Sequence, residues 1–136
     1  MEKKIILWTH ELATDIAWQD FQHREFLKFT NQLFDEFYTN KGYLDLDPSI
    51  RYLEVYARNH LGIEERYMDL FGYPETAAHK VQHQVFREFI EDLKKTERNS
   101  TLEGARLCNK LNNWFTEHIK TIDQTLGLFL KEQGQK

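Results

Sequence analysis

Three pairs of potential metal ligands occur at short spacings along the sequence, and one further histidine precedes them. The pairs are His60 with Glu64, His79 with His83, and His118 with Asp123, and the preceding residue is His23. On an α-helix a spacing of four residues is a rotation of ~40°, so the first two pairs can each converge on one centre. A spacing of five is a rotation of ~140°, which predicts that the third pair flanks something wider than a single ion.

These residues lie on faces that are otherwise apolar, where they would be costly without a partner. An unpaired buried carboxylate costs several kcal/mol and an unsatisfied polar ring ~1–3 kcal/mol, against a domain stability of ~5–15 kcal/mol. One such histidine would be interpreted as an ordinary core residue with a hydrogen-bond partner. Five of the six histidines together with Glu64 need a common partner, and a pair of metal ions supplies one.

The donor count predicts two unequal metal positions. The available donors are five imidazoles, two carboxylates that can each bridge, and one solvent-derived bridge. One ion then has three histidines and three bridging oxygens. The other ion has two histidines and the same three oxygens. The first ion is six-coordinate, and the second keeps a position for a small ligand. Imidazole with carboxylate suits iron, manganese, cobalt or zinc, and the lone Cys108 excludes an iron–sulfur cluster.

The elements that must position these residues are predicted to be helices. Apolar residues recur at spacings of three and four between breakers, which predicts an all-α fold, an antiparallel up-down-up-down four-helix bundle with an extended N-terminal arm. We expect Asp47 to cap the second helix with Pro48 at its first position, Pro74 to open the third, and Ser100 to begin a capping box. One domain is expected over residues 1–136, with an arm at about 1–18 and helices at about 19–39, 48–71, 74–96 and 101–131.

Composition limits the partners. The net charge of −4 and the pI of about 5.9 come without a basic stripe, which argues against nucleic acid. The apolar run near the N-terminus is too short for a signal peptide or a membrane anchor, and the single cysteine is typical of a reducing compartment. We therefore expect a cytoplasmic protein with no membrane contact, as a monomer or a weak homo-oligomer.

The motifs together resemble a known family. They are Trp8, Asp20-x-x-His23, His60-Leu-Gly-Ile-Glu64-Glu-Arg-Tyr-Met68, Tyr73-Pro74 before His79-Lys-Val-Gln-His83, and Trp114-x-x-x-His118-Ile-Lys-Thr-Ile-Asp123. This pattern is similar to that of the hemerythrins, particularly the bacterial hemerythrins, over nearly the whole chain. The resemblance implies two iron ions with a bridging oxo or hydroxo group. It assigns His79, His83 and His118 to the six-coordinate iron, His23 and His60 to the other, and Glu64 and Asp123 as bridges.

The function that the resemblance implies is reversible dioxygen binding, for storage, transport or delivery, and not an enzymatic reaction. The alternative is a sensor of dioxygen, nitric oxide or redox state that uses the same centre; a di-iron peroxidase or nitric-oxide reductase is a further alternative. Either enzyme would need a proton donor near the open position, and the sequence shows no obvious donor beyond the ligands. We expect Trp114 and Phe115 to line the ligand pocket, with Phe115 where hemerythrins commonly have leucine.

Three other positions carry expectations. Asp15 occupies the region in which the family often has glycine, which leaves the geometry of the arm open. His10 and Glu65 are expected at the surface, because neither has a ligand partner at a good helical spacing. The E-x-x-H motif of ferritin-like oxygen-activating sites does not occur in the sequence, which favours reversible binding over oxygen activation.

Overall fold

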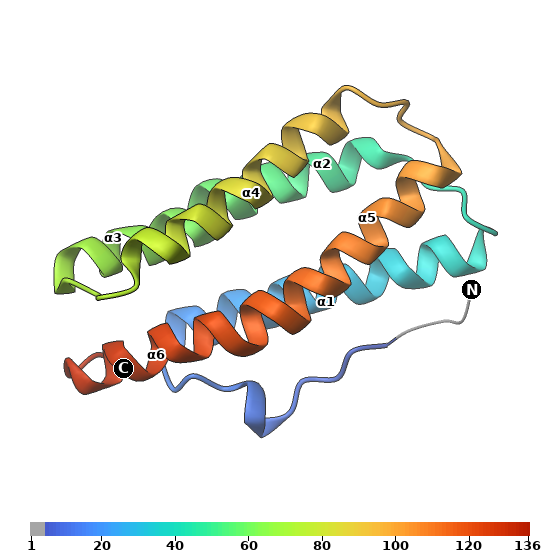
Figure 1. Cartoon of the computed structure of the whole chain (residues 1–136). Helices are drawn as coiled ribbons and strands as arrows, with labels where there is room; N and C mark the ends of the chain where they lie inside the picture. Colours follow the sequence, from blue (N-terminus) through green and yellow to red (C-terminus); the bar gives the residue numbers. More distant parts are fainter. Residues whose placement is uncertain (1–4) are drawn as a thin grey trace.

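Four antiparallel helical rods make up the structure, a computed structural model that describes residues 5–136 (Figure 1). The first rod is α1 (Ala17–Thr39), and the third is α4 (Thr76–Lys94). The second rod joins α2 (Leu46–Tyr56), η2 (Ala57–Leu61) and α3 (Gly62–Phe71) end to end. The fourth joins α5 (Thr101–Asn113), η3 (Trp114–Ile122) and α6 (Asp123–Glu132). The all-α four-helix bundle predicted from the sequence is confirmed, and the described residues contain no strand.

The second and fourth rods are each interrupted by a π-helical segment. In a π-helix the backbone hydrogen bonds run from residue i to i+5, so each turn holds more residues than an α-turn. Both segments carry predicted metal ligands, since η2 contains His60 and η3 contains His118. The apolar spacing of the sequence did not predict these two segments.

Three of the four predicted helix starts are wrong by two residues, and the fourth is confirmed. The first rod begins at Ala17 and not at about residue 19. The second rod begins at Leu46, because Asp45 and not Asp47 is the N-cap and accepts a hydrogen bond from the Asp47 N–H. The third begins at Thr76 and not at Pro74, which lies in the preceding turn. Ser100 is confirmed as the N-cap of the fourth helix, since its side chain accepts a hydrogen bond from the Glu103 N–H.

The N-terminal arm lies along the outside of the bundle, next to α1 and α6 (Figure 1). The side chain of Asn31 in α1 donates to Ile6 O at 2.7 Å and accepts from Ile6 N at 2.9 Å, which fixes the start of the described arm. The short 3-10 turn η1 (His10–Leu12) follows, and the arm ends at Asp15, whose φ is +67°. Residues 1–4 of the predicted arm lie outside the described residues.

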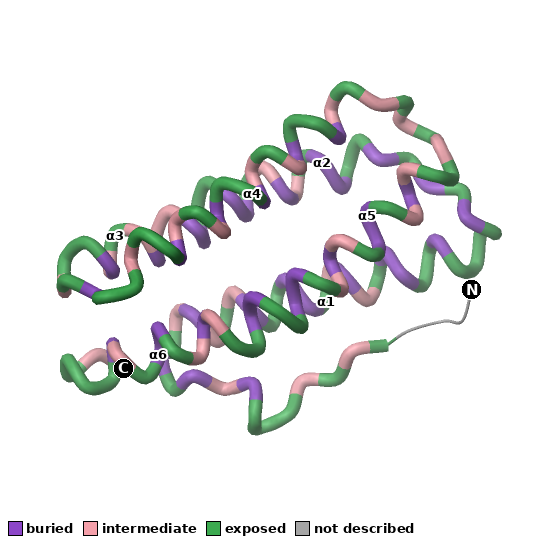
Figure 2. Tube along the Cα trace, in the orientation of Figure 1, coloured by how far each residue is buried: buried purple, intermediate pink, exposed green. Residues whose placement is uncertain are grey.

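The core lies along the axis of the bundle, where the buried faces of the rods meet (Figure 2). The buried stripe of α1 contains Phe26, Leu27, Thr30, Leu33, Phe34 and Phe37. Within the described residues, none of the helices is both long and apolar enough to cross a membrane.

Candidate metal centre

All seven residues predicted as ligands lie together in the interior of the bundle, between the four rods. Each is at most 2% exposed. They form two groups, in which the candidate ligand atoms lie within 4.8 Å of one another. The first group holds His79, His83 and His118 and the second holds His23 and His60, while Glu64 and Asp123 belong to both. The division into three and two histidines is the one that the resemblance implied.

The carboxylate of Glu64 turns one oxygen toward each group. Its Oε1 lies 3.1 Å from His83 Nε2 and 3.5 Å from His79 Nε2. Its Oε2 lies 3.2 Å from His60 Nε2 and 3.9 Å from His23 Nε2. A carboxylate that divides its oxygens in this way can bridge two ions.

Asp123 divides its oxygens between the same two groups. Its Oδ1 lies 3.0 Å from His118 Nε2 and 3.1 Å from His79 Nε2. Its Oδ2 lies 2.9 Å from His23 Nε2. The two carboxylates therefore face the same two positions, one beside three histidines and one beside two.

The spacing of the donor atoms fits coordination better than hydrogen bonding. His79 Nε2 and His118 Nε2 lie 3.2 Å apart, and two ligands that are each ~2.1 Å from one ion at a right angle are ~3.0 Å apart. Four buried atoms that face the centre lack a hydrogen-bond partner of acceptable geometry: His60 Nε2, His83 Nε2, Glu64 Oε1 and Asp123 Oδ1. Buried polar atoms in native proteins are nearly always satisfied, so their convergence indicates a bound cation.

One geometric prediction for this site was wrong. From α-helical geometry, His118 and Asp123 were expected on widely separated faces, flanking the centre. Because η3 is a π-helix, residues five apart lie nearly above one another, and His118 Nε2 approaches Asp123 Oδ1 at 3.0 Å. The two side chains therefore converge on one position, and Asp123 reaches the other position with its second oxygen.

Comparison with known proteins bears on what such a centre holds. The family described as Hemerythrin HHE cation binding domain matches residues 14–129. The chain belongs to the hemerythrin family. Among similar proteins are the bacteriohemerythrins of Pseudomonas aeruginosa, with 27% identity over 87% of this chain and 76% of that protein, and of Clostridium acetobutylicum, with 27% over 88% and 97%. The bacteriohemerythrin of Methylococcus capsulatus is 28% identical over 90% of this chain and 95% of its own.

Side chains outside the centre orient three of its five histidines. The Nδ1 atom of His60 bonds to Gln22 Oε1, and that of His118 bonds to Gln82 Oε1 at 2.9 Å. An Nδ1–H that donates outward leaves the Nε2 lone pair directed at the centre, which is the tautomer a metal ligand needs. Each glutamine directly precedes a histidine of the centre in the sequence but bonds to a histidine on a different helix, so sequence spacing gave no sign of either contact.

The third oriented histidine, His83, has a charged partner. Its Nδ1 lies 2.9 Å from Glu65 Oε2, and Arg87 binds both oxygens of Glu65 at 2.9 and 3.1 Å. Burial alone would raise the pKa of Glu65, but the hydrogen bonds from Arg87 and His83 outweigh it and hold the pKa below its ordinary value. The expectation that Glu65 is an ordinary surface residue is therefore wrong, because its carboxylate holds a buried histidine of the centre.

Gln19 is a further residue that contacts the centre, and the sequence did not reveal it. Its side chain is fully buried, and Nε2 donates to Glu64 Oε2 at 2.9 Å and, at 3.4 Å, to the backbone carbonyl of Asp123. Gln19 lies in the first turn of α1, ahead of the stripe that carries His23. It therefore supports a carboxylate that faces both halves of the centre.

The charges of the centre favour a bound cation. Burial raises the pKa of Asp123, and the charge of Glu64 adds to that, but the nearby histidines His118 and His23 outweigh both and lower it. The pKa of Glu64 is likewise well below its ordinary value, because His60 and the other histidines overcome the effect of burial. Burial lowers the pKa of His79, yet hydrogen bonds to the two carboxylates raise it to about 9. Two ionised carboxylates in a closed interior need positive charge close by.

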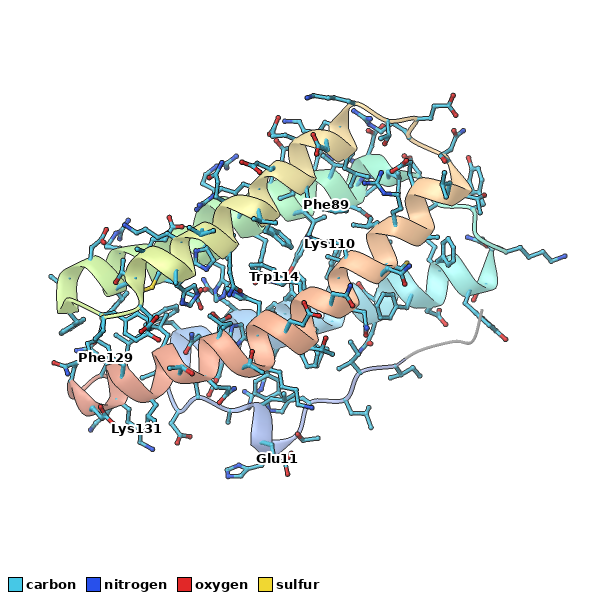
Figure 3. The ribbon with its side chains drawn as sticks, in the orientation of Figure 1. Glu11, Phe89, Lys110, Trp114, Phe129 and Lys131 are labelled. Carbon is cyan, nitrogen blue, oxygen red and sulfur yellow. The ribbon has the colours of Figure 1, made fainter. Side chains whose placement is uncertain are left out.

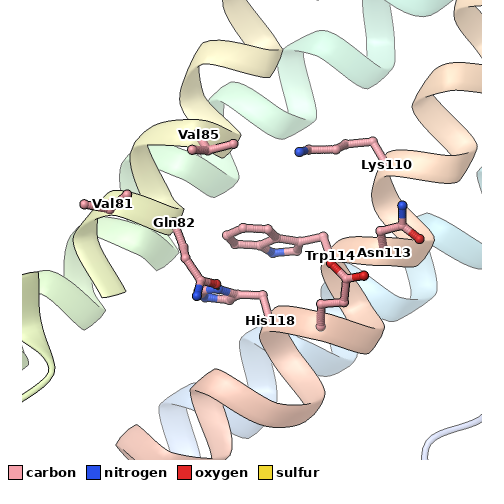
Figure 4. A pocket seen from close by; sticks show the side chains of 8 residues that line it. Val81, Gln82, Val85, Lys110, Asn113, Trp114 and His118 are labelled. Atoms are coloured by element: carbon pink, nitrogen blue, oxygen red, sulfur yellow. The ribbon is translucent and has the colours of Figure 1, made fainter. Parts of the chain in front are cut away.

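A surface pocket of about 350 Å³ between α4 and α5 reaches toward the centre (Figure 4). Its lining includes Gln82 of α4 and also Trp114 and His118 of η3. The Trp114 ring is stacked on the His118 ring with a centroid distance of 3.8 Å, and its role as a lining residue of the ligand pocket stays a prediction. Phe115 is buried in the main core cluster, and its role as a lining residue of the ligand pocket remains a prediction.

Proposed function

We propose that this protein binds dioxygen reversibly at a pair of iron ions held by the seven residues of the centre, and that it stores, transports or delivers dioxygen. The unequal donor sets of the two halves carry this proposal. Three histidine nitrogens and two carboxylate oxygens face one position, whereas two nitrogens and two oxygens face the other. Residues 1–136 form one domain in this proposal, and the metal is iron because the chain belongs to the hemerythrin family.

The open place belongs to the half formed by His23 and His60. If two ions shared one solvent-derived oxygen, the half with three histidines would offer its ion six donors and the half with two histidines would offer five. Iron supplies the electrons on which dioxygen binding depends. The protein supplies a rigid, buried set of imidazoles and two carboxylates, and the matching family is described as a cation-binding domain without reference to a reaction.

The surroundings of the half formed by His23 and His60 favour dioxygen binding without a subsequent reaction of the bound ligand. Phe26 and Phe86 are fully buried beside Tyr56, whose ring is stacked on that of His60. Apolar rings of this kind keep bulk water and its protons away from a bound ligand. A ligand held in such surroundings can leave again unchanged.

The test is an optical titration with iron. Protein loaded with ferrous iron under anaerobic conditions is expected to hold two ions per chain, to develop a ligand-to-iron absorption band in air, and to lose that band under vacuum over repeated cycles. His60→Ala should abolish the reversible band, whereas His10→Ala, which changes an exposed histidine of η1, should leave it intact. A single irreversible conversion, or steady oxygen consumption with an added reductant, would contradict the proposal.

A further inference from the structure

Two aromatic residues lie at the starts of the two π-helical segments, Tyr56 directly before η2 and Trp114 as the first residue of η3. Tyr56 lies four residues before His60, and Trp114 lies four residues before His118. Each ring is stacked on its histidine, with centroid distances of 5.0 Å for Tyr56 and 3.8 Å for Trp114. Trp114 projects from the fourth rod toward the interior (Figure 3), where its indole Nε1 donates a hydrogen bond to the Tyr56 hydroxyl oxygen at 3.2 Å.

The proton of the Tyr56 hydroxyl has no acceptor among the residues that the structure describes. Tyr56 is 6% exposed, and the bond from Trp114 uses its oxygen as an acceptor only. The neighbouring rings of Phe26 and Phe86, at centroid distances of 4.6 and 5.8 Å, offer no oxygen or nitrogen. A buried donor left without an acceptor is unfavourable, so such a group indicates a partner that is not part of the protein.

The position of this hydroxyl relates it to one half of the centre. The Tyr56 ring lies on His60, which belongs to the half with two histidines and two carboxylate oxygens. The indole N–H occupies one side of the phenol oxygen and so restricts the direction in which the O–H can point. The Tyr56 ring thus lies beside the half that has the smaller donor set, and its hydroxyl is held by the indole of Trp114, whose ring is stacked on His118 of the other half.

We propose that the Tyr56 hydroxyl donates a hydrogen bond to a small ligand with a free lone pair, such as azide or reduced dioxygen, bound at the half of the centre formed by His23 and His60. Trp114 is the positioning residue that orients this hydroxyl. The inference rests on the proposed two-ion centre, and it adds a residue that determines ligand affinity. No proton leaves Tyr56 in this role, because the phenol stays neutral and only shares its hydrogen.

The experiment compares Tyr56→Phe with the wild type, using azide as the probe on the diferric protein. The variant is expected to keep two irons per chain and to bind azide on the order of tenfold more weakly, the effect of losing one hydrogen bond to an anion. In the wild type the azide stretching frequency should shift in D2O, and in Tyr56→Phe that shift should disappear. Equal affinity and an equal D2O shift in the two proteins would overturn the inference.

Two further variants separate the hydroxyl from general packing. Tyr52→Phe removes a hydroxyl one turn earlier on α2, from a ring stacked on Phe29, and should leave azide binding unchanged. As a single substitution, Trp114→Phe should weaken azide binding. The double variant Trp114→Phe with Tyr56→Phe should bind azide about as weakly as Tyr56→Phe alone, because Trp114 acts through the hydroxyl. Additive effects would show that Trp114 acts independently. A wild-type protein that holds no iron would overturn the proposed function together with this inference.

Discussion

At the scale of single residues, Gln19 shows how the interior holds its carboxylates in place. Its amide donates to Glu64 Oε2 at 2.9 Å, and that oxygen also faces His60 and His23. A carboxylate that must face two positions at once depends on such a donor to keep its plane fixed. Outer contacts of this kind change metal affinity by ~10–100-fold when they are removed from other metalloproteins.

We therefore predict that Gln19→Leu lowers the affinity of the centre for metal by ~10–100-fold, because Glu64 loses its fixed donor while the shape of the side chain is nearly retained. Competition with a chromophoric chelator would measure this, with zinc or ferrous iron as the metal. Gln32→Leu, an exposed position on the same helix, serves as the matched control. Equal affinity in Gln19→Leu and the control would show that the contact does not support the centre.

The seven residues that converge at the centre were predictable from the sequence, whereas the residues that contact them were not. His23 and Glu64 are polar residues on stripes that otherwise bury apolar side chains, and such a conflict shows in a single sequence. Gln19 and Tyr56 break no pattern, since a tyrosine suits a core face and a glutamine near a helix start suits the surface. Only the contacts of Gln19 with Glu64 and of Tyr56 with Trp114, across the bundle, reveal that they adjoin the centre.

At the scale of helices, the four rods were predictable and their internal geometry was not. Apolar spacing reports an average helical period, so it located the rods to within about two residues but could not show that η2 and η3 are π-helical. These segments matter because they set the direction of His60 and His118. The start of the second rod was misplaced for a similar reason, since Asp45 and Asp47 are both good caps and only the fold selects between them.

The packing of α6 against the arm yields a prediction at this scale. A Cβ added at Gly127 would lie 2.7 Å from Thr14 Cβ and 3.0 Å from Gln19 Oε1, so Gly127→Ala must displace the start of α1. We expect it to lower the free energy of unfolding by ~1–3 kcal/mol, as overpacking of a core does. Gly62→Ala is the control, because a Cβ there meets nothing within 4 Å in a helical backbone, and it should stabilise the protein by ~0.5–1 kcal/mol. Urea unfolding of both variants measures the contrast, and equal effects would contradict it.

At the scale of the whole molecule, the metal centre and the stability of the bundle are linked through protons. The seven residues lie between all four rods, so whatever binds them also holds the rods together. Without metal, protons on histidine provide part of the positive charge that the two carboxylates need. The pKa of His79 is raised from 6.5 to about 9, mainly by Asp123 and Glu64 acting against the effect of burial.

The last prediction follows from this raised pKa of His79. In the metal-free protein, the stability that protonated His79 contributes is complete below pH 6.5 and is lost as the pH rises toward 9. In the metal-loaded protein His79 binds without its proton, so apparent metal affinity increases with pH, by about 1.4 kcal/mol per pH unit for each proton released. The difference in Tm between zinc-loaded and metal-free protein should therefore widen between pH 6.5 and 9. His10→Ala should show the same widening, because His10 lies outside the centre. If the Tm difference between zinc-loaded and metal-free protein stays constant or narrows over this pH range, His79 does not exchange a proton for the metal.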